Sequence, residues 1–513
     1  MSLLRSIATI GSLTMVSRVL GLVRDILIAN IVDKAITDAF FVAFKFPNLF
    51  RRLFAEGAFN AAYVPQFAKR LTGQGRQAAL VFADQVASVM TSWLLVFTIS
   101  SVVAMPLLMY GIAYGFTDEP DKFALTVELS RITFPYLMFM ALTAMLAGTL
   151  NSVGRFAAAA AAPIVLNIVL ISSLLLLTAG VLTLPGHALA WAVAIAGAGQ
   201  LAWVAAACGR HGVMLHLPRP RLSPDVRRLF RIMVPAVMGY GVVQINMLID
   251  MFLATLLPEG SVSYLFYADR LNQLPLGVIG VSVGVALLPT MTRQLRAGAT
   301  EAAADSQNRG IEIALVLAVP ATAALIVIAD PIISVIYQRG RFTPGMTDAT
   351  AAALMAFAVG LPAYVMQRAL TPGFFAREDT VTPVKIAIVV VVANVALAVV
   401  LMQFLQHVGI ALATGLTAWL NAGLLGYVLH RRGYLVIDRR LKRRLPRIIV
   451  STLAMAGAVW WAADRMAAQL AGPWWLQIPA LAALVGLGAA LYLGLAHVTG
   501  AARLGELKTA FRK

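Results

Sequence analysis

The sequence predicts an all-α membrane protein whose helices cross the bilayer many times. Hydrophobic residues make up 60% of the 513 residues, charged residues make up 12%, and the mean hydropathy is +0.83. This composition is typical of polytopic helical membrane proteins. The apolar runs are about 20 residues long, as membrane-spanning helices require, whereas the strands of a membrane β-barrel would alternate over about ten residues.

The apolar runs predict 14 membrane-spanning helices. An even number of crossings places both ends of the chain on the same side of the membrane. We expect no cleavable signal peptide, because the first apolar run contains Arg18, Arg24 and Asp25. The predicted spans are residues 8–30, 37–62, 80–111, 123–150, 158–180, 185–208, 228–257, 261–291, 309–336, 346–371, 383–404, 408–429, 447–468 and 474–498.

The basic residues are distributed unevenly over the predicted loops. Of the 41 Lys and Arg residues, 28 fall on the side of the two termini, five fall on the opposite side, and eight lie at or near membrane depth. Basic loops stay in the cytoplasm, so both termini are predicted to be cytoplasmic. The net charge of +18 is therefore expected to orient the chain and to contact anionic phospholipids, and no nucleic-acid partner is expected.

Two basic connections divide the chain into three groups of helices. Residues 209–231 contain three prolines and six arginines, and residues 430–447 contain eight basic residues. Such stretches are typical of loops outside the membrane. The predicted organisation is an N-lobe of six helices at 1–208, a basic cytoplasmic linker at 209–227, a C-lobe of six helices at 228–430, and a C-terminal helix pair with a basic tail at 431–513.

The second predicted helix carries charges within an apolar run. Its segment TDAFFVAFKFPNLFRRLFAEGAF, residues 37–59, is apolar enough to enter a bilayer. A charge in the middle of a membrane costs several kcal/mol unless it faces water or a partner, so this helix is expected to line a polar cavity. Pro47 is expected to break or kink it. At about 100° per residue, one side of the helix presents Asp38, Lys45, Asn48, Arg52 and Glu56.

The first predicted helix shows the same property. Its segment SRVLGLVRD, residues 17–25, contains two arginines and an acid. Arg18 and Asp25 share a helical face, and a break at Gly21 would bring Arg24 toward the same cavity. The alternative is that both arginines extend to one membrane surface. They lie roughly 10 Å apart along the helix axis, so both cannot easily reach the same headgroup layer, which favours the cavity.

The two six-helix groups show a weak internal repeat. A shift of 224 residues places Lys45 on Asp269. Like the second helix, the segment YADRLNQLPLG at 267–277 carries charges, Asp269 and Arg270, within an apolar run. Two similar lobes with polar, proline-interrupted helices at matching positions indicate alternating access around a central site.

The charges of the first, second and eighth helices predict a cationic central cavity. Cations outnumber acids by six to four, and an anion would stabilise the excess cations in a low-dielectric cavity. Arginine binds phosphate and carboxylate oxygens in a bidentate manner, so we expect a substrate with such a group. The alternative is that the arginines only pair with nearby acids and brace the lobes. The predicted substrate-binding residues are Arg18, Arg24, Asp25, Asp38, Lys45, Asn48, Arg51, Arg52, Glu56, Asp269 and Arg270.

The sequence gives no support for an enzyme. It lacks glycine-rich nucleotide-binding motifs and His or Cys clusters with metal-ligand spacing, and its one cysteine is Cys208. No cofactor is expected, and transport would draw on a Na⁺ or H⁺ gradient, the membrane potential or the substrate gradient. Asp250 and Asn394, in the seventh and eleventh helices, are candidate ligands of a coupling cation. The alternative is that each makes a hydrogen bond between packed helices.

Three segments resemble those of the MurJ (MviN) family of lipid II flippases: residues 17–25, residues 37–59 and YADRLNQLPLGV. This family belongs to the multidrug/oligosaccharidyl-lipid/polysaccharide exporter superfamily. The resemblance covers nearly the whole chain, including PGFFAREDTVTPVKIA at 372–387. It implies two six-helix lobes in a V shape and a C-terminal helix pair that forms a groove for an undecaprenyl tail. The family's essential cavity arginines match Arg18, Arg24, Arg52 and Arg270, and its acid on the second helix matches Asp38.

The resemblance implies a transporter of the bacterial cytoplasmic (inner) membrane. Its substrate would be an undecaprenyl-diphosphate-linked muropeptide, the peptidoglycan precursor lipid II, moved from the inner to the outer leaflet. Cell-wall synthesis proteins are further candidate partners. Some relatives carry an acid where this chain has Gln273, and their sodium-binding acids are matched only loosely, by Asp250 and Asn394. The alternatives are an exporter of another anionic lipid-linked oligosaccharide and a non-transporting membrane scaffold for cell-wall synthesis.

Overall fold

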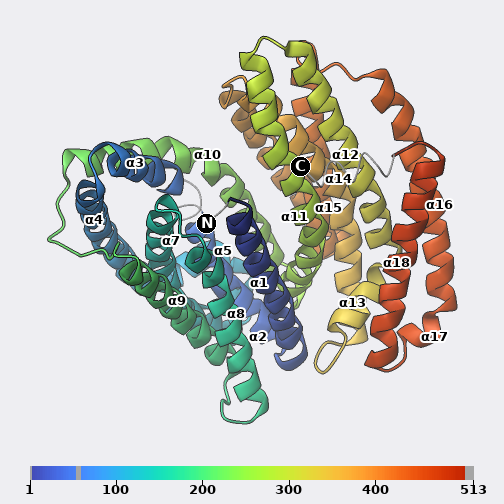
Figure 1. Cartoon of the computed structure of the whole chain (residues 1–513). Helices are drawn as coiled ribbons and strands as arrows, with labels where there is room; N and C mark the ends of the chain where they lie inside the picture. Colours follow the sequence, from blue (N-terminus) through green and yellow to red (C-terminus); the bar gives the residue numbers. More distant parts are fainter. Residues whose placement is uncertain (1–2, 53–58, 503–513) are drawn as a thin grey trace. The chain divides into compact units, whose positions relative to one another are not determined.

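Helices form every secondary-structure element in the computed structural model (Figure 1), which describes residues 3–52 and 59–502. The prediction of an all-α protein is thus confirmed. The chain divides into two compact units, residues 1–263 and 264–513. This division follows packing, whereas the predicted lobe boundaries at 208, 227 and 430 follow the loops and stay a prediction.

Unit 1 contains the helices from α1 to α10. One of its apolar cores lies where α3, α4, α7 and α10 pack together, and Phe67, Phe82 and Leu229 are buried there. α8 packs against α1 and α9, and α2 packs against α6. The helices are α1 (Leu3–Ile31), α2 (Lys34–Phe50), α3 (Phe59–Gly73), α4 (Arg76–Val103), α5 (Met105–Ile112), η2 (Tyr114–Asp118), α6 (Pro120–Thr133), α7 (Tyr136–Ser152), α8 (Ala157–Thr178), α9 (Pro185–Arg210) and α10 (Pro224–Thr255).

Unit 2 contains the remaining helices, although α11 begins just before the boundary. α14 packs along α12 and α15, and the buried side chains of Leu315, Phe374 and Leu425 belong to their common core. The helices are α11 (Ser261–Arg296), α12 (Thr300–Val327), α13 (Ala329–Tyr337), α14 (Pro344–Phe375), α15 (Val381–Arg431), α16 (Arg439–Arg465), α17 (Ala467–Leu470) and α18 (Trp474–Val498).

The predicted spans coincide with helices throughout the described part of the chain. In residues 3–52 and 59–502, nine helical segments are long and apolar enough to cross a bilayer, and the number of 14 crossings stays a prediction. α12 and α16 begin about eight or nine residues before the predicted spans at 309 and 447, because their polar first turns continue the helix beyond the apolar run. Asp438 caps α16, where its Oδ1 atom accepts a hydrogen bond from the Leu441 amide at 2.7 Å.

α15 contains two of the predicted spans, joined by a sharp turn. Gln406 interrupts the helix with φ 49° and ψ −131°, between the predicted spans 383–404 and 408–429. The chain then returns close to itself, and a Cβ atom at Gly409 would lie 2.5 Å from the carbonyl of Leu401. Glycine is required at this position because any side chain would overlap that backbone.

The C-terminal helices are attached to unit 2 by buried polar contacts as well as apolar ones. Glu312 of α12 is 3% exposed and forms ion pairs with Arg309, Arg440 and Arg444. α16 and α18 pack against each other (Figure 1), and the Tyr492 hydroxyl of α18 donates a hydrogen bond to the Val316 carbonyl at 2.7 Å. α12 therefore anchors both long helices of the C-terminal pair.

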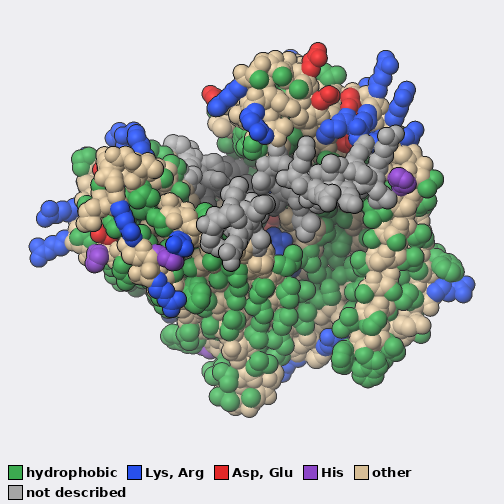
Figure 2. Space-filling view, viewed as in Figure 1, with side chains coloured by type: hydrophobic (Ala, Val, Ile, Leu, Met, Phe, Trp, Pro, Cys, Tyr) green, Lys and Arg blue, Asp and Glu red, His purple; other side chains and the backbone are tan. Residues whose placement is uncertain are grey.

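Each unit exposes apolar side chains on its surface, as expected for contact with lipid. Figure 2 shows hydrophobic side chains covering much of the visible face, while Lys and Arg side chains gather mainly in its upper part. Large apolar side chains are exposed on several helices, among them Val96 at 65%, Leu107 at 74% and Leu453 at 66%. Exposed apolar bands of this kind are expected for helices that contact lipid.

Candidate functional site

Arg24 and Asp25 of α1 form a buried ion pair. Arg24 is 7% exposed, Asp25 is fully buried, and the Arg24 Nη2 and Asp25 Oδ1 atoms are 2.6 Å apart. The Arg24 Nη1 atom also donates a hydrogen bond to Asn167 Oδ1 of α8 at 3.0 Å. Asn167 in turn donates to the Ser17 carbonyl at 2.9 Å. The guanidinium thus fastens α1 to α8, through a partner that the sequence analysis did not select.

Arg18 lies in a different environment on the same helix. Its side chain is exposed, whereas those of Arg24 and Asp25 are buried. α1 runs without interruption from Leu3 to Ile31, so the expected break at Gly21 is absent. Contacts with α8, rather than a bend, therefore separate the two arginines: one braces the helix pair and the other is accessible.

α2 separates the charges that were predicted to share one polar side. Asp38 is 1% exposed, whereas Lys45 and Arg52 are exposed and Asn48 is half-buried. Glu56 lies outside the described residues. The cations Lys45 and Arg52 are therefore accessible, whereas Asp38, which was predicted on the same side of the helix, is buried within the protein.

The end of α2 places two adjacent arginines differently. α2 continues past Pro47 to Phe50, and a π-type turn follows at residues 51–52. The Arg51 Nε atom donates to Asn48 Oδ1 at 2.9 Å, whereas Arg52 is exposed beside Met247 of α10, with its Nη1 atom 3.7 Å from the sulfur. π-type turns are frequent at functional sites, and this one directs the two side chains to different surroundings.

Asp38 joins three helices on the predicted outer side. Its carboxylate accepts hydrogen bonds from the Gly260 amide at 2.7 Å, the Ser263 amide at 2.9 Å and the Ser263 hydroxyl at 2.6 Å. Lys122 of α6 lies 3.6 Å from Asp38 Oδ2 and above the ring of Phe116. Asp38 therefore ties α2 to α6 and to the first turn of α11, and Lys122, which precedes the predicted span 123–150, is a buried cation.

The predicted charges of α10 and α11 have local partners. Asp250 Oδ2 accepts a hydrogen bond from Asn246 at 3.1 Å, and Asp269 accepts one from Gln273. Asp250, Asp269 and Arg270 are all half-buried. Gln273 is thus a hydrogen-bond partner of Asp269, four residues away on the same helix.

Asn394 makes a hydrogen bond between the two arms of α15. It is 2% exposed, and its Oδ1 atom accepts from the Thr417 hydroxyl at 3.0 Å. Asp250 lies in unit 1 and Asn394 in unit 2, and the described residues contain no group of three or more His, Cys, Asp or Glu side chains that could hold a metal ion. The coupling-cation site stays a prediction.

Arg368 is a further exposed cation in unit 2. It lies within the predicted span 346–371, and its side chain packs over two glycines of α11. A Cβ atom at Gly280 would lie 3.4 Å from Arg368 Cγ, and one at Gly284 would lie 3.9 Å from Arg368 Cβ. The glycines leave room for the arginine, which forms no ion pair or hydrogen bond with the described residues.

Two buried partners go beyond what the sequence indicates. Lys122 and Asn167 are the buried partners of Asp38 and Arg24. Arg368, one of the eight cations predicted at or near membrane depth, is exposed in an apolar helix but was not among the predicted substrate-binding residues. Asn167 is the one strongly polar residue in the apolar run at 158–171, a signal that could have identified it. No sequence pattern links Lys122 to Asp38, because the two are brought together only by the packing of α2 against α6.

Comparisons with known proteins agree with the fold. A family model described as "Lipid II flippase MurJ" matches residues 28–475. A probable lipid II flippase MurJ from Rhizobium tropici is 43% identical, over 99% of this chain and 96% of that protein. A lipid II flippase MurJ from Burkholderia cenocepacia is 33% identical, over 98% of each chain.

Solved structures show the same arrangement of helices. A structure described as "Lipid II flippase MurJ, inward closed conformation" covers 95% of this chain and 98% of its own, with a TM-score of 0.79 and 23% identity. An inward-facing multidrug transporter of the MATE family covers 83% of this chain and 98% of its own, with a TM-score of 0.68 and 14% identity. The family match spans most of the sequence, and this chain therefore belongs to the MurJ family of lipid II flippases.

Proposed function

We propose that this protein is a lipid II flippase, a transporter rather than an enzyme, of the bacterial cytoplasmic membrane. It would move the undecaprenyl-diphosphate-linked peptidoglycan precursor from the inner to the outer leaflet. The family membership and the relatives named above support this substrate. Both termini would lie in the cytoplasm, as the distribution of basic residues indicates.

The observation that carries the proposal is the exposure of cations within apolar helices. Arg18, Lys45 and Arg52 are exposed on α1 and at or near α2. The acids nearest in sequence bind groups of the protein itself. Asp25 pairs with Arg24, and Asp38 pairs with Lys122 and accepts hydrogen bonds from backbone amides. Exposed guanidinium and ammonium groups at membrane depth suit a diphosphate, which binds several cations at once.

Alternating access gives the Asp38 contact a role in the transport cycle. The contact involves Gly260 and Ser263, where α11 begins on the predicted outer side. A contact of this kind has to form in one state and break in another if the helices are to move. We infer that Asp38 stabilises the state in which these helices are held together, and that the cations described above meet the substrate.

The test is complementation in cells depleted of their own lipid II flippase. Arg18, Arg52, Arg270 and Arg368 are each replaced by Ala, membrane levels are measured, and lipid II in the outer leaflet is followed. The matched control is Arg443→Ala, because Arg443 is an exposed arginine at the start of α16, within the predicted basic cytoplasmic connection. We expect normal levels for all five variants, with flipping and viability lost for Arg18 and Arg52 and retained for the control.

The outcome separates the proposal from its alternatives. If Arg18→Ala and Arg52→Ala both flip lipid II at the control rate, the exposed cations do not bind the substrate and the cationic-site mechanism is wrong. If viability is restored while no variant or wild-type protein moves lipid II in proteoliposomes, the protein acts as a scaffold for cell-wall synthesis instead.

A further inference from the structure

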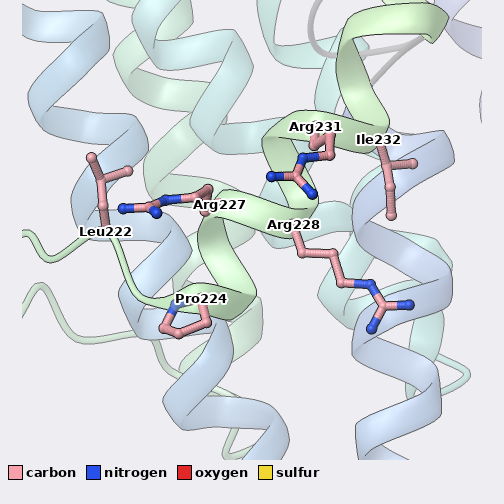
Figure 3. Close-up of a pocket in the computed structure, with 6 residues that line it drawn as sticks. All are labelled: Leu222, Pro224, Arg227, Arg228, Arg231 and Ile232. Atoms are coloured by element: carbon pink, nitrogen blue, oxygen red, sulfur yellow. The ribbon is translucent and has the colours of Figure 1, made fainter.

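A cavity of about 540 Å³ lies at the start of α10, within unit 1. Three arginines from the first two turns of the helix line it, together with apolar side chains (Figure 3). Arg227 extends toward Leu222, whereas Arg228 extends away from it. The lining residues are Leu222, Pro224, Arg227, Arg228, Arg231 and Ile232.

The rest of this turn is fixed by its own contacts. The Ser223 hydroxyl donates a hydrogen bond to Gln85 Oε1 of α4 at 2.8 Å, and Asp225 forms an ion pair with Arg70 of α3 at 2.8 Å. Val226 and Leu229 are fully buried in the core of unit 1. The start of α10 is therefore held in place on one side, while the arginines occupy the other.

The three guanidinium groups have no anionic partner in the described part of the chain. Arg227, Arg228 and Arg231 are exposed, and none of their side chains forms an ion pair or a hydrogen bond with residues 9–52 or 59–502. Arg227 and Arg231 are four residues apart and Arg228 and Arg231 three apart, spacings at which like charges repel on a helix. A bound anion would relieve this repulsion, and phosphate oxygens fit the arginine fork.

Apolar side chains beside the arginines narrow the class of ligand. Leu222 is 62% exposed and Ile232 is 45% exposed, and both line the same cavity. The cavity lies at the beginning of the predicted span 228–257, next to the basic linker, where the phosphate layer of the cytoplasmic leaflet is expected. A ligand with both a phosphate and acyl chains would satisfy the two kinds of lining, whereas a free phosphate would leave the apolar part unused.

We propose that this cavity binds the headgroup of an anionic phospholipid of the cytoplasmic leaflet. The phosphodiester would contact Arg227, Arg228 and Arg231, and the glycerol and first methylenes would lie against Leu222 and Ile232. The site goes beyond the proposed function, because this lipid is not transported. Its occupancy would stabilise the cytoplasmic end of α10.

The test is lipid binding by the full-length protein in detergent micelles, measured by native mass spectrometry. The probes are dioleoylphosphatidylglycerol and, as a neutral lipid of equal chain length, dioleoylphosphatidylcholine. We expect tighter binding of phosphatidylglycerol, weakened about 100-fold in the triple variant Arg227→Gln/Arg228→Gln/Arg231→Gln, since each basic residue near an anionic lipid surface contributes about 1 kcal/mol. The triple Lys variant keeps the charges and should bind within about tenfold of the wild type, which also reports correct folding.

The matched control removes three charges elsewhere. Arg439, Lys442 and Arg443 are exposed in the first turns of α16, so Arg439→Gln/Lys442→Gln/Arg443→Gln should retain phosphatidylglycerol binding. Equal loss in both triple variants, or equal binding of the two lipids by the wild type, would overturn the proposal. Displacement of phosphatidylglycerol by inorganic phosphate would indicate a simple anion site, and tighter binding of undecaprenyl diphosphate at these arginines would assign the cavity to the transported lipid; either result would contradict it.

Discussion

Burial distinguishes the two arginines of α1 more sharply than their positions in the sequence do. Arg24 is enclosed and paired with Asp25 and Asn167, whereas Arg18 is exposed. A buried ion pair leaves an uncompensated charge when one partner is removed, and an exposed arginine does not. Substitution of the two residues should therefore have different consequences for stability.

We expect Arg24→Ala to lower the free energy of unfolding by about 3–5 kcal/mol, because the buried Asp25 carboxylate would lose its ion pair with Arg24. Arg18→Ala should change it by less than about 0.5 kcal/mol. Thermal unfolding of the purified proteins in detergent measures both effects. The double variant Arg24→Ala/Asp25→Asn should recover part of the loss. Equal melting temperatures for Arg24→Ala and Arg18→Ala would show that the pair contributes nothing.

The buried Asp38–Lys122 pair allows a second test. Lys122→Met keeps the length of the side chain, removes its charge and leaves the Asp38 carboxylate dependent on hydrogen bonds from Gly260 and Ser263. In a double-mutant cycle with Asp38→Asn, we expect a coupling energy above about 1 kcal/mol. The control is the partly exposed pair of Lys34 and Glu259, 3.4 Å apart, for which coupling should be smaller. Additive effects of Lys122→Met and Asp38→Asn would contradict the structural role of the pair.

The sequence identified charges in apolar helices but not their partners. Arg24 and Asn167 are 143 residues apart, and periodicity along one helix contains no information about such a contact. Asp38 was predicted to face the same polar cavity as Lys45, yet it is buried. Helical periodicity predicts which polar residues share one side of a single helix. The packing of neighbouring helices decides which of these residues are accessible.

At the scale of elements, the loop between α14 and α15 contains an acid, Asp379, that binds both ends of α15. Asp379 accepts hydrogen bonds from the Thr382 amide at 2.9 Å and the Thr382 hydroxyl at 2.6 Å, and it forms an ion pair with Arg432. The Thr382 hydroxyl, the Thr382 amide and Arg432 together lower the pKa of Asp379 to about 2. The carboxylate thus fastens the first turn of α15 to the end of its second arm.

The contacts of Asp379 predict a pH dependence of local stability. The folded-state pKa of Asp379 is lowered to about 2, whereas an unperturbed Asp titrates near about 3.9. Its contribution is therefore fully present above about pH 4 and is lost as the pH falls toward about 2. Because the Asp379–Arg432 pair is partly exposed and screened, we expect about 1 kcal/mol.

Hydrogen exchange of the Val381, Thr382 and Val384 amides, corrected for the intrinsic rate, measures this effect between pH 5 and pH 2. The variant Asp379→Asn should exchange faster at pH 5 and should lose the dependence on pH. An unchanged pH dependence in Asp379→Asn would mean that another group controls the opening of this turn.

The positions of the helices could be predicted well from apolar run lengths, and their ends less well. The break between the two arms of α15 was anticipated at residues 405–407, and it lies at Gln406. The early starts of α12 and α16 were missed, because hydropathy detects the bilayer-spanning part of a helix and not a polar turn that precedes it. The cap at Asp438 was missed for the same reason, because it precedes this polar turn.

At the scale of the whole molecule, Glu312 determines how the C-terminal pair is attached. The residue is buried in α12, and two of its three arginine partners, Arg440 and Arg444, belong to α16. The basic run before the final pair marks it as a separate group in the sequence, but no sequence pattern indicates its contact with Glu312. The basic run at 430–447 was explained by topology alone, although Arg444 within it is only 8% exposed.

We expect Glu312→Gln to destabilise the protein by about 3 kcal/mol or more, because the buried Arg444 guanidinium would lose its ion pair with Glu312. The effect should include faster proteolysis in the loop at 432–438, as α16 separates from α12. Thermal unfolding and limited proteolysis measure the two changes. Glu301→Gln is the control, since Glu301 is exposed in the first turn of the same helix. Similar proteolysis of both variants would show that Glu312 does not hold the pair.

The placement of α10 in unit 1 has a consequence for biosynthesis. Its side chains Val226 and Leu229 complete the core formed by α3, α4 and α7, and domains fold from the N-terminus while the chain is being made. The donors that Asp38 requires, at Gly260 and Ser263, leave the ribosome after all of α10. Until they arrive, the nascent chain holds an acid in its second helix without these hydrogen bonds, so the insertion of the first unit is finished only when the first turn of α11 has been synthesised.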